Sequence, residues 1–320
     1  MPKNLTLNSK PSLSFVIPVF NEAENIKDLY LEIVDMCQHS QFTDFEIIVV
    51  DDNSKDNTLE VLRALTPIKV ITFRKQFGQT AAMDAGIKAA INDLIITLDG
   101  DGQNDPAEVP KMIAHLFEKN LDVVSGWRKH RKDTTSKKVV SRVANFLRSK
   151  IINDGINDSG CSLKVYRKEC FDHVNLYGEM HRFIPAILKI QGFKVGEVVV
   201  NHRARTKGLT KYTWSRSVKG LIDMIAVWFW KKYALRPLHL LGALGFGFVF
   251  LSFLFGLMTV REFLIGQDLS DTLWLMLTLF TFMIGLVIFI SGLIMDILVK
   301  SHFETTNNRP YLVKEVFENK

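Results

Sequence analysis

The stretch Leu94-Ile95-Ile96-Thr97-Leu98-Asp99-Gly100-Asp101-Gly102-Gln103 decides how the rest of this chain is interpreted. Its first five residues are almost all apolar, which is typical of a strand buried on both faces, and two carboxylates separated by one glycine follow directly. Such a pair can hold one hard divalent cation, because Mg²⁺ takes oxygen ligands and usually keeps only one or two from the protein. Taken alone, the triplet is also compatible with a solvated turn, so its meaning depends on the other strand ends.

Two upstream strands are predicted to end in the same way. Residues 13–17 lead into Pro18-Val19-Phe20-Asn21-Glu22, and residues 45–50 lead into Asp51-Asp52-Asn53-Ser54-Lys55-Asp56. Apolar residues recur at helical spacing between these strands, namely Ile26, Leu29, Tyr30, Ile33, Val34 and Cys37, then Leu59, Leu62 and Leu65, then Ala82, Ala85 and Ala89. This alternation predicts an α/β fold with a doubly wound, mostly parallel sheet that binds its ligand outside the carboxyl ends of the strands. A dinucleotide-binding fold is less favoured, because no G-x-G-x-x-G follows the first strand.

Three motifs at these strand ends carry a resemblance to a known family. They are Pro18-x-x-Asn21-Glu22, Asp51-Asp52-x-Ser54-x-Asp56 and Asp99-x-Asp101-x-Gln103-x-Asp105-Pro106. The chain resembles family 2 glycosyltransferases, whose nucleotide-diphosphosugar domain has a Rossmann-like GT-A fold. More narrowly, it is similar to the polyprenyl-phosphate glycosyltransferases, the group of dolichyl-phosphate mannose synthase and bactoprenol glucosyltransferase. Further matching motifs are Gly126-Trp127-Arg128, Ser141-Arg142-x-x-Asn145, Asp158-Ser159-Gly160-Cys161 through Lys164 and Arg167, Arg205-x-x-Gly208-x-x-Lys211-Tyr212, and Arg309-Pro310-Tyr311.

The resemblance implies a reaction and a donor site. The expected reaction transfers a sugar from a nucleotide-diphosphosugar donor to the phosphate of a membrane polyprenyl phosphate, with inversion and with a divalent metal, Mg²⁺ or Mn²⁺. A UDP-sugar such as UDP-glucose and the acceptor undecaprenyl phosphate are favoured, because the two C-terminal spans resemble those of the bactoprenol enzymes. The implied metal ligands are Asp99, Asp101 and Gln103, and the implied nucleotide-binding residues are Pro18, Phe20, Glu22 and Asp52. Phe20 departs from the family, which usually has tyrosine or a similar residue there, so a hydroxyl contact is absent.

The acceptor side needs positive charge more than it needs a base. A phosphate monoester has its second ionisation near pH 6, so the acceptor arrives already anionic and a strong general base is dispensable. By resemblance, the cations that bind the acceptor or the diphosphate are Arg128, Arg142, Arg205 and Lys211. Asp158 joins Asp99 and Asp101 as an implied catalytic carboxylate and would orient the phosphate or a sugar hydroxyl. Alternatively, Asp158 caps a turn with its two neighbours.

Two uncharged runs predict membrane spans in the C-terminal part of this chain of 320 residues. Residues 238–260 and 273–294 contain no Asp, Glu, Lys or Arg, and each run is long enough to cross about 30 Å of hydrocarbon as a helix. We therefore expect four parts: a glycosyltransferase domain over residues 1–212, an interfacial amphipathic helix over 213–236, two transmembrane helices over 237–299 and a tail over 300–320. Basic residues flank the two runs and acids lie between them, so the positive-inside rule places the catalytic domain and both termini in the cytoplasm, beneath the bacterial inner membrane.

The charge of the chain favours a membrane partner and no nucleic acid. Formal net charge is +6, and residues 128–150 carry nine Lys and Arg against one acid. That segment lacks the aromatic residues that stack on bases, so an anionic bilayer and a lipid phosphate fit better. Residues 214–233 show an apolar stripe with basic flanks, which predicts either an interfacial helix or one packed against the first span. Cys37, Cys161 and Cys170 lack metal-ligand spacing and are interpreted as packing residues in a reducing compartment. A homo-oligomer such as a tetramer would fit relatives with a similar tail.

Two other functions use the same donor domain. A processive polysaccharide synthase would carry a Gln-x-x-Arg-Trp motif and more spans, and the sequence has neither. A membrane-tethered nucleotide-binding scaffold without turnover would lose the metal-binding acids or the acceptor cations, and both sets are present.

Overall fold

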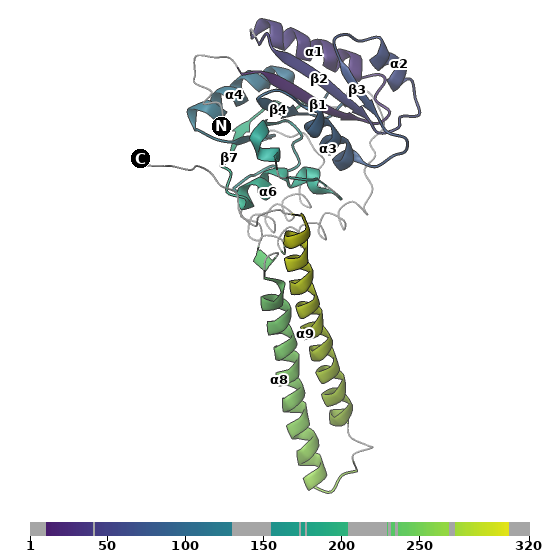
Figure 1. Cartoon of the computed structure of the whole chain (residues 1–320), viewed down its shortest axis with the longest axis vertical. Coiled ribbons are helices and arrows are strands. Elements are labelled where there is room, and N and C mark those ends of the chain that lie inside the picture. Colours follow the sequence, from purple (N-terminus) through teal and green to yellow (C-terminus); the bar gives the residue numbers. More distant parts are fainter. Residues whose placement is uncertain are drawn as a thin grey trace. The chain divides into compact units, whose positions relative to one another are not determined.

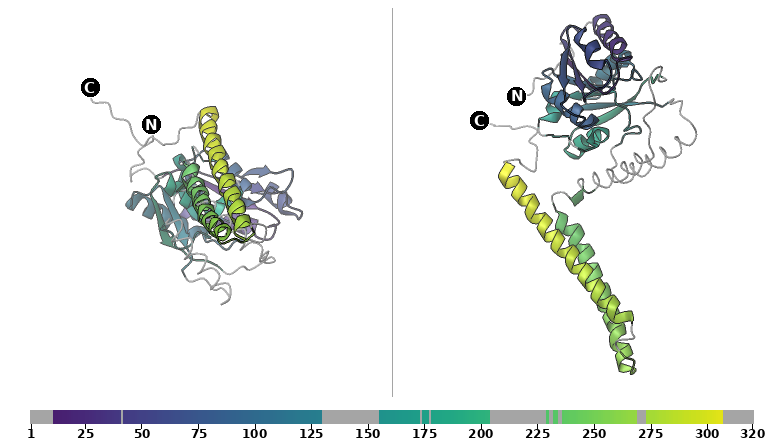
Figure 2. Two further views of the ribbon diagram at one scale, coloured as in Figure 1. Left: turned by 90° about the horizontal axis from the view of Figure 1, so that it is seen from below. Right: turned by 90° about the vertical axis from the view of Figure 1, so that its right-hand side faces the viewer.

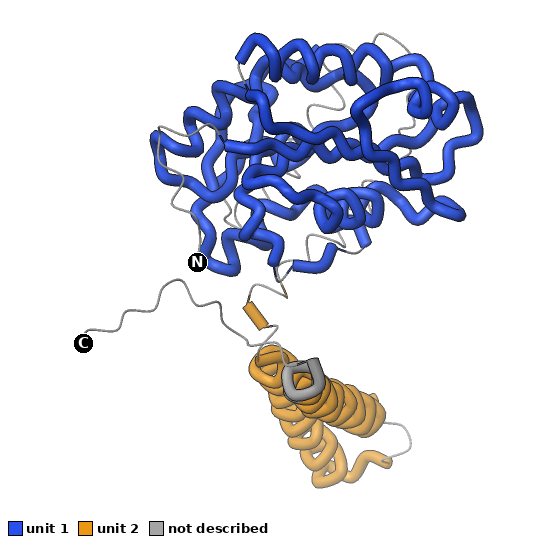
Figure 3. The backbone as a smooth tube through the Cα atoms, turned by 45° about the horizontal axis from the view of Figure 1, so that its top comes forward, with its two compact units in different colours: residues 1–227 blue, residues 228–320 orange. Residues whose placement is uncertain are grey.

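The computed structural model describes residues 11–40, 42–129, 155–172, 174–176, 178–203, 229, 232–233, 236–268 and 273–306. The chain divides into two compact units, residues 1–227 and residues 228–320 (Figure 3). We call them the N-terminal unit and the C-terminal unit.

The described part of the N-terminal unit is built on a sheet of seven strands in the order β3-β2-β1-β4-β6-β5-β7. At its centre, β1 (Leu13–Val19) pairs in parallel with β2 (Phe45–Asp51) and with β4 (Leu94–Thr97). The sheet is extended by β3 (Lys69–Thr72) beside β2, and by β5 (Val123–Trp127) and β7 (Val195–Val199), which pair in parallel with each other. Only β6 (Lys164–Arg167) is antiparallel among these strands, and it joins β4 to β5. The prediction of a mostly parallel sheet is therefore confirmed.

Helices cover both faces of this sheet, as the doubly wound pattern predicts (Figure 1). One core contains side chains of α1 (Ile26–His39), α2 (Thr58–Arg63) and α4 (Val109–Glu118) against one face of the sheet. The other core contains α3 (Gln79–Ala89) and α6 (Ile184–Ile190). Three short turns of 3₁₀ helix complete the unit: η1 (Pro106–Glu108), η2 (Lys168–Phe171) and η3 (Met180–Arg182). The helices expected from the periodicity before β2, after β2 and before β4 are confirmed as α1, α2 and α3.

Packing accounts for all three cysteines. Cys37, Cys161 and Cys170 are free thiols and are buried. Burial raises the pKa of Cys37 to about 12 and the pKa of Cys161 to about 11. These thiols are therefore protonated near neutral pH and behave as small apolar groups.

The C-terminal unit contains two long apolar helices, α8 (Pro237–Leu264) and α9 (Leu273–Thr306), which lie side by side (Figure 2). Pro237–Leu264 and Leu273–Val299 are each long and apolar enough to span a membrane. Large apolar side chains on both helices face outward, among them Phe250 at 63% exposed and Phe280 at 60% exposed, which does not fit a buried core helix. The two uncharged runs are thus confirmed as candidate membrane spans. Most of residues 213–236, the predicted interfacial helix, lie outside the described part of the chain.

Small and polar residues join the two apolar helices. A Cβ atom on Gly245 would lie 2.8 Å from the carbonyl oxygen of Gly285, so only glycine allows the backbones this close. Two turns further along α8, the Ser252 hydroxyl donates to the carbonyl oxygen of Thr278 at 2.8 Å. Close backbone approach and interhelical hydrogen bonds are the usual means of helix association in lipid, where burial of apolar surface gives no net driving force.

Candidate active site

Two carboxylates lie in the loop after β4, and glycines give this loop its shape. A Cβ atom on Gly100 would come within 2.6 Å of Cγ1 of Val19, because the loop packs directly against the end of β1. Gly102 has a φ of +70°, a conformation that side chains with a Cβ rarely adopt. The glycines therefore place Asp99 and Asp101 at the carboxyl edge of the sheet, where the sequence predicts the ligand.

Hydrogen bonds fix the orientation of both carboxylates. The side-chain amide of Gln79, the first residue of α3, donates to Oδ1 of Asp99 at 2.7 Å. The backbone N–H of Gln103 donates to Oδ1 of Asp101 at 3.1 Å. Gln79 was not predicted as a site residue, because its position in the sequence says nothing about which strand end its side chain reaches.

The chemistry of this loop fits a hard divalent cation that is shared with a phosphate substrate. Within the part of the chain that the structure describes, no group of three or more His, Cys, Asp and Glu side chains forms a closed metal site. Two carboxylates suit Mg²⁺ or a similar ion, which takes oxygen ligands, keeps water and completes its shell with substrate phosphates. The side-chain amide nitrogen of Gln103 lies 3.5 Å from the carbonyl oxygen of Arg203. A direct contact of the Gln103 side chain with a metal stays a prediction.

The predicted nucleotide-binding residues lie on two adjacent loops. Asn21, with a φ of +54°, joins these loops, because its backbone N–H donates to the Ser54 hydroxyl and its side-chain oxygen accepts from the backbone of Lys55. Pro18 is the next-to-last residue of β1 and lies opposite Val50 of β2, and Phe20 and Glu22 follow the strand. The structure thus brings the loop of Pro18, Phe20 and Glu22 next to the loop that carries Asp52.

Asp52 also organises the loop that leads into α3. Its two carboxylate oxygens accept the backbone N–H groups of Phe77 at 2.7 Å and of Gly78 at 2.9 Å, and the residue is buried. Because Gly78 is the residue before Gln79, this bond also places the Gln79 side chain that orients Asp99. Asp52 is therefore connected to the loop of Asp99 and Asp101 through the start of α3.

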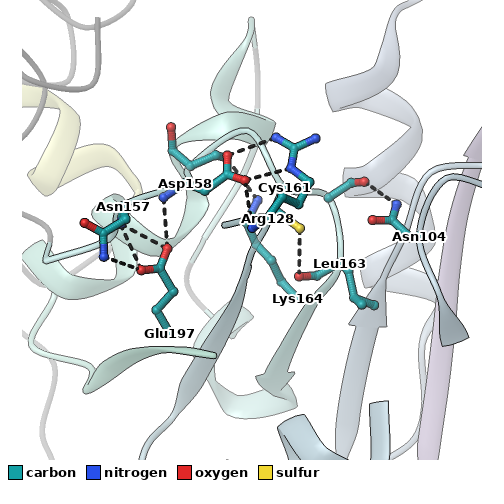
Figure 4. A network of polar contacts seen from close by, with 10 residues as sticks. Asn104, Arg128, Asn157, Asp158, Cys161, Leu163, Lys164 and Glu197 are labelled. Atoms are coloured by element: carbon teal, nitrogen blue, oxygen red, sulfur yellow. Dashed lines mark hydrogen bonds and ion pairs between the residues drawn. The ribbon is translucent and has the colours of Figure 1, made fainter. Parts of the chain in front are cut away.

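Arg128 and Asp158 form a mostly buried ion pair (Figure 4). Nε and Nη2 of Arg128 donate to the two oxygens of Asp158 at 2.7 and 2.9 Å, and the backbone N–H of Arg128 donates at 3.2 Å. The side chains are only 10% and 12% exposed. Burial opposes the charge on Arg128, but the hydrogen bonds and the charge of Asp158 outweigh this effect and raise the pKa of Arg128. Glu197 of β7 holds the backbone N–H of Asp158 at 2.9 Å, so three parts of the chain meet at this carboxylate.

Lys164 lies in the same cluster and is 2% exposed. Burial lowers the pKa of its ammonium group to about 8, although the nearby carboxylates of Asp99 and Asp158 oppose this shift. Sequence reasoning gave Lys164 no role beyond its place in a motif. A signal was available, because a lysine between the apolar residues Leu163 and Val165 is unusual in a buried strand.

The segment after β7 is hydrogen-bonded to the loop after β4 that carries Asp99 and Asp101. The backbone N–H of Arg203 donates to the carbonyl oxygen of Gln103 at 3.0 Å, and Asn104 pairs with His202 in an antiparallel bridge. The Arg203 guanidinium also donates to Asp105 at 2.8 Å and to Glu32 at 2.7 Å. Of the four predicted acceptor cations, Arg128 lies beside this loop, and Arg142, Arg205 and Lys211 lie outside the described residues.

Comparison with known families agrees with this geometry. Residues 14–174 match the family model described as glycosyl transferase family 2, a range that contains β1 from its second residue, the loop of Asp99 and Asp101, and the Arg128–Asp158 pair. The chain belongs to glycosyl transferase family 2. The family resemblance stated from the motifs is therefore confirmed, and the protein is a glycosyltransferase.

Named relatives of this glycosyltransferase extend the similarity over nearly its whole length. It is 36% identical to the dodecaprenyl-phosphate galacturonate synthase of Rhizobium johnstonii over 315 residues. This alignment covers 96% of this chain and 93% of that protein. It is 33% identical over 253 residues to the undecaprenyl-phosphate 4-deoxy-4-formamido-L-arabinose transferase of Yersinia pestis, covering 78% of this chain and 75% of that protein. Both names describe polyprenyl-phosphate sugar transferases.

Solved structures support the fold of this glycosyltransferase. The mannosyl-3-phosphoglycerate synthase from Rubrobacter xylanophilus superposes with a TM-score of 0.55 at 17% identity over 68% of this chain and 74% of that one. The glucosyl-3-phosphoglycerate synthase from Mycobacterium tuberculosis, in complex with Mn²⁺, UDP and its product, gives a TM-score of 0.52 at 16% identity over 69% and 80% of the two chains. The expected GT-A-type architecture is confirmed.

Proposed function

We propose that this glycosyltransferase transfers one sugar from a nucleotide-diphosphosugar to the phosphate of a membrane polyprenyl phosphate. The observation that carries the proposal is the similarity to the galacturonate synthase, which covers 96% of the chain and therefore both the acid-bearing sheet and the two apolar helices. A lipid acceptor also explains why a nucleotide-sugar site and candidate membrane spans occur in one chain.

The proposed reaction is a direct displacement at C1 of the sugar. An oxygen of the polyprenyl phosphate attacks C1 of the sugar, and the bond from C1 to the β-phosphate oxygen breaks. Its electron pair leaves with the nucleoside diphosphate, so no proton has to be removed from the nucleophile. Attack from the side opposite the leaving group inverts the configuration at C1. The products are a nucleoside diphosphate and a polyprenyl-phosphate sugar.

Different residues of the site have different roles in this displacement. Asp99 and Asp101 would hold a divalent cation, Mg²⁺ or Mn²⁺, which when bound neutralises charge on the departing diphosphate. Gln79 keeps the Asp99 carboxylate in position, and the loop of Pro18, Phe20 and Glu22 contacts the nucleoside. Asp52 contributes by fixing the loop before Gln79.

Positive charge on the acceptor side would bring the phosphate dianion beside the diphosphate. Arg128 carries a fixed charge that Asp158 orients, and Arg142, Arg205 and Lys211 are proposed to add the rest. Asp158 then acts by positioning Arg128. The site lies on the cytoplasmic side of a bacterial inner membrane, because nucleotide sugars are made in the cytoplasm.

The donor we favour is a UDP-sugar whose sugar is a hexuronic acid. Sequence analysis pointed to UDP-glucose as an example, but the relative matched over most of its length is named for galacturonate. Dodecaprenyl and undecaprenyl phosphate are both suitable acceptors by the names of the two relatives.

Release of nucleoside diphosphate from a donor panel tests this function. Purified full-length protein with Mn²⁺ receives UDP-galacturonic acid, UDP-glucuronic acid, UDP-glucose, UDP-N-acetylglucosamine or GDP-mannose, with polyprenyl phosphate, with the uncharged polyprenol or with no lipid. We expect fast release from one donor with polyprenyl phosphate only. Equal release without lipid would show hydrolysis, and no release from any donor would leave the scaffold as the better account.

A further inference from the structure

The Lys164 ammonium group is buried and has few hydrogen-bond partners. It donates one long hydrogen bond, 3.5 Å to the carbonyl oxygen of Ser159, and no other hydrogen bond to the described residues. An ammonium group has three donors, and a buried charge without good partners is costly. The neighbouring Arg128 shows the contrast, because it donates three bonds of 2.7 to 3.2 Å to Asp158.

The position of Lys164 places this charge at the donor site. Lys164 pairs with Thr97 across β4 and β6, and Thr97 precedes Asp99 by two residues. Asp99, Asp158 and Arg128 all act electrostatically on the ammonium group. The lysine is therefore close to the carboxylates that are proposed to bind the metal and to the ion pair on the acceptor side.

The charge balance of this cluster favours an anionic ligand. Asp99 and Asp101 are two negative groups, Arg128 and Asp158 compensate each other, and Lys164 adds one positive charge. A divalent cation would neutralise the two aspartates, and the Glu197 carboxylate is engaged by the backbone N–H groups of Asn157 and Asp158, so Lys164 keeps a positive charge that no ion pair among the described residues offsets. A buried ammonium group with unused donors is suited to an anionic oxygen.

We infer that Lys164 is a donor-binding residue that donates to an anionic oxygen of the sugar nucleotide. This inference rests on the proposed function and adds the chemical class of the group that is recognised. Two groups of the proposed donor have that chemistry: the carboxylate of a hexuronic acid and the diphosphate. A lysine that served only the fold would lower Tm when it is replaced and would leave the Kd values of the folded protein unchanged.

Calorimetric binding to the full-length protein with Mn²⁺ tests the inference and separates the two sources. The probes are UDP, UDP-glucose and UDP-galacturonic acid, and the variants are Lys164→Met and, as a matched control, Lys69→Met on the exposed end of β3. If the carboxylate is the partner, Lys164→Met raises the Kd for UDP-galacturonic acid about ten- to a hundredfold and leaves the other two within about twofold. If the diphosphate is the partner, all three Kd values rise by that factor. The control changes none of them.

Several outcomes would overturn the inference. Unchanged Kd values for all three probes in a folded Lys164→Met protein would show that the lysine does not bind the donor. If Lys164→Met fails to fold, Lys164→Gln removes the charge but retains a hydrogen-bond donor, and the same comparison applies to it. Failure of the proposed function would look different, because wild-type protein would then release no nucleoside diphosphate from any donor in the presence of polyprenyl phosphate, whatever it binds.

Discussion

Removal of the Asp158 carboxylate is expected to destabilise the N-terminal unit strongly. Asp158→Ala leaves the Arg128 guanidinium in a site where its side chain is 10% exposed, without the acceptor of three hydrogen bonds. Breaking a buried ion pair by removing one partner costs about 3–5 kcal/mol, and the remaining solvent contact favours the lower end, about 3 kcal/mol. For a unit of this size, 1 kcal/mol shifts Tm by about 2–4 °C, so we expect Tm to fall by about 6–12 °C.

Thermal unfolding of the purified full-length protein, followed by intrinsic fluorescence, measures this shift. Lys88→Ala is the matched control, because it removes the 54% exposed partner of Asp84 and leaves the hydrogen bond of Asp84 to the backbone of Leu176 in place, and such exposed pairs contribute about 1 kcal/mol or less. The double variant Arg128→Met with Asp158→Leu should regain much of the loss, because it leaves no buried charge unpaired. The reasoning is refuted if Asp158→Ala shifts Tm no more than the control, or if the double variant is as unstable as the two single changes combined.

Four further predictions follow from the site and the spans. Asp101→Asn should lower turnover by about a hundredfold or more with Tm unchanged, because it removes a charged ligand of similar size; near-normal turnover would exclude Asp101 as a metal ligand. Gly100→Ala should lower both turnover and Tm, because its Cβ would lie 2.6 Å from Cγ1 of Val19, and Val19→Ala in the same chain should recover part of both; no effect would show that the loop is not packed there. Neutralising Arg205 and Lys211 together should raise the KM for polyprenyl phosphate far more than the KM for the sugar nucleotide, and the reverse order would assign these cations to the donor. A cysteine at position 267, in the loop between α8 and α9, should react with an impermeant thiol reagent in intact cells, whereas one at position 319 should react only after lysis; the opposite pattern would contradict the cytoplasmic orientation.

The central sheet was predictable because its signals are local. Each of β1, β2 and β4 is a short apolar run that ends in acids, and the intervening helices show clear apolar spacing. Parallel strands bring their carboxyl ends to one edge, so the meeting of the three acidic loops follows from the fold class. The two long uncharged runs were equally clear, because few soluble helices sustain that length without charge.

The contacts within the site were not predictable, because they join distant parts of the sequence. Arg128 follows β5, whereas Asp158 precedes β6, and only the antiparallel insertion of β6 between β4 and β5 makes them neighbours. The same insertion places Lys164 opposite Thr97, two residues before Asp99. The pairing of Asp52 with the backbone of Phe77 and Gly78 depends on where the loop after β3 turns, and nothing in the spacing of residues specifies that turn.

The mass and phosphorus chemistry of the lipid product test the central claim most directly. Purified protein is incubated with Mn²⁺, polyprenyl phosphate and the donor that supports nucleoside diphosphate release, and the extracted lipid is examined by mass spectrometry and ³¹P NMR. The account predicts a lipid heavier by one sugar residue, with a single phosphorus in a phosphodiester. A lipid of unchanged mass, a lipid that carries several sugars, or a product with two phosphorus atoms would contradict the transfer of one sugar to a polyprenyl phosphate.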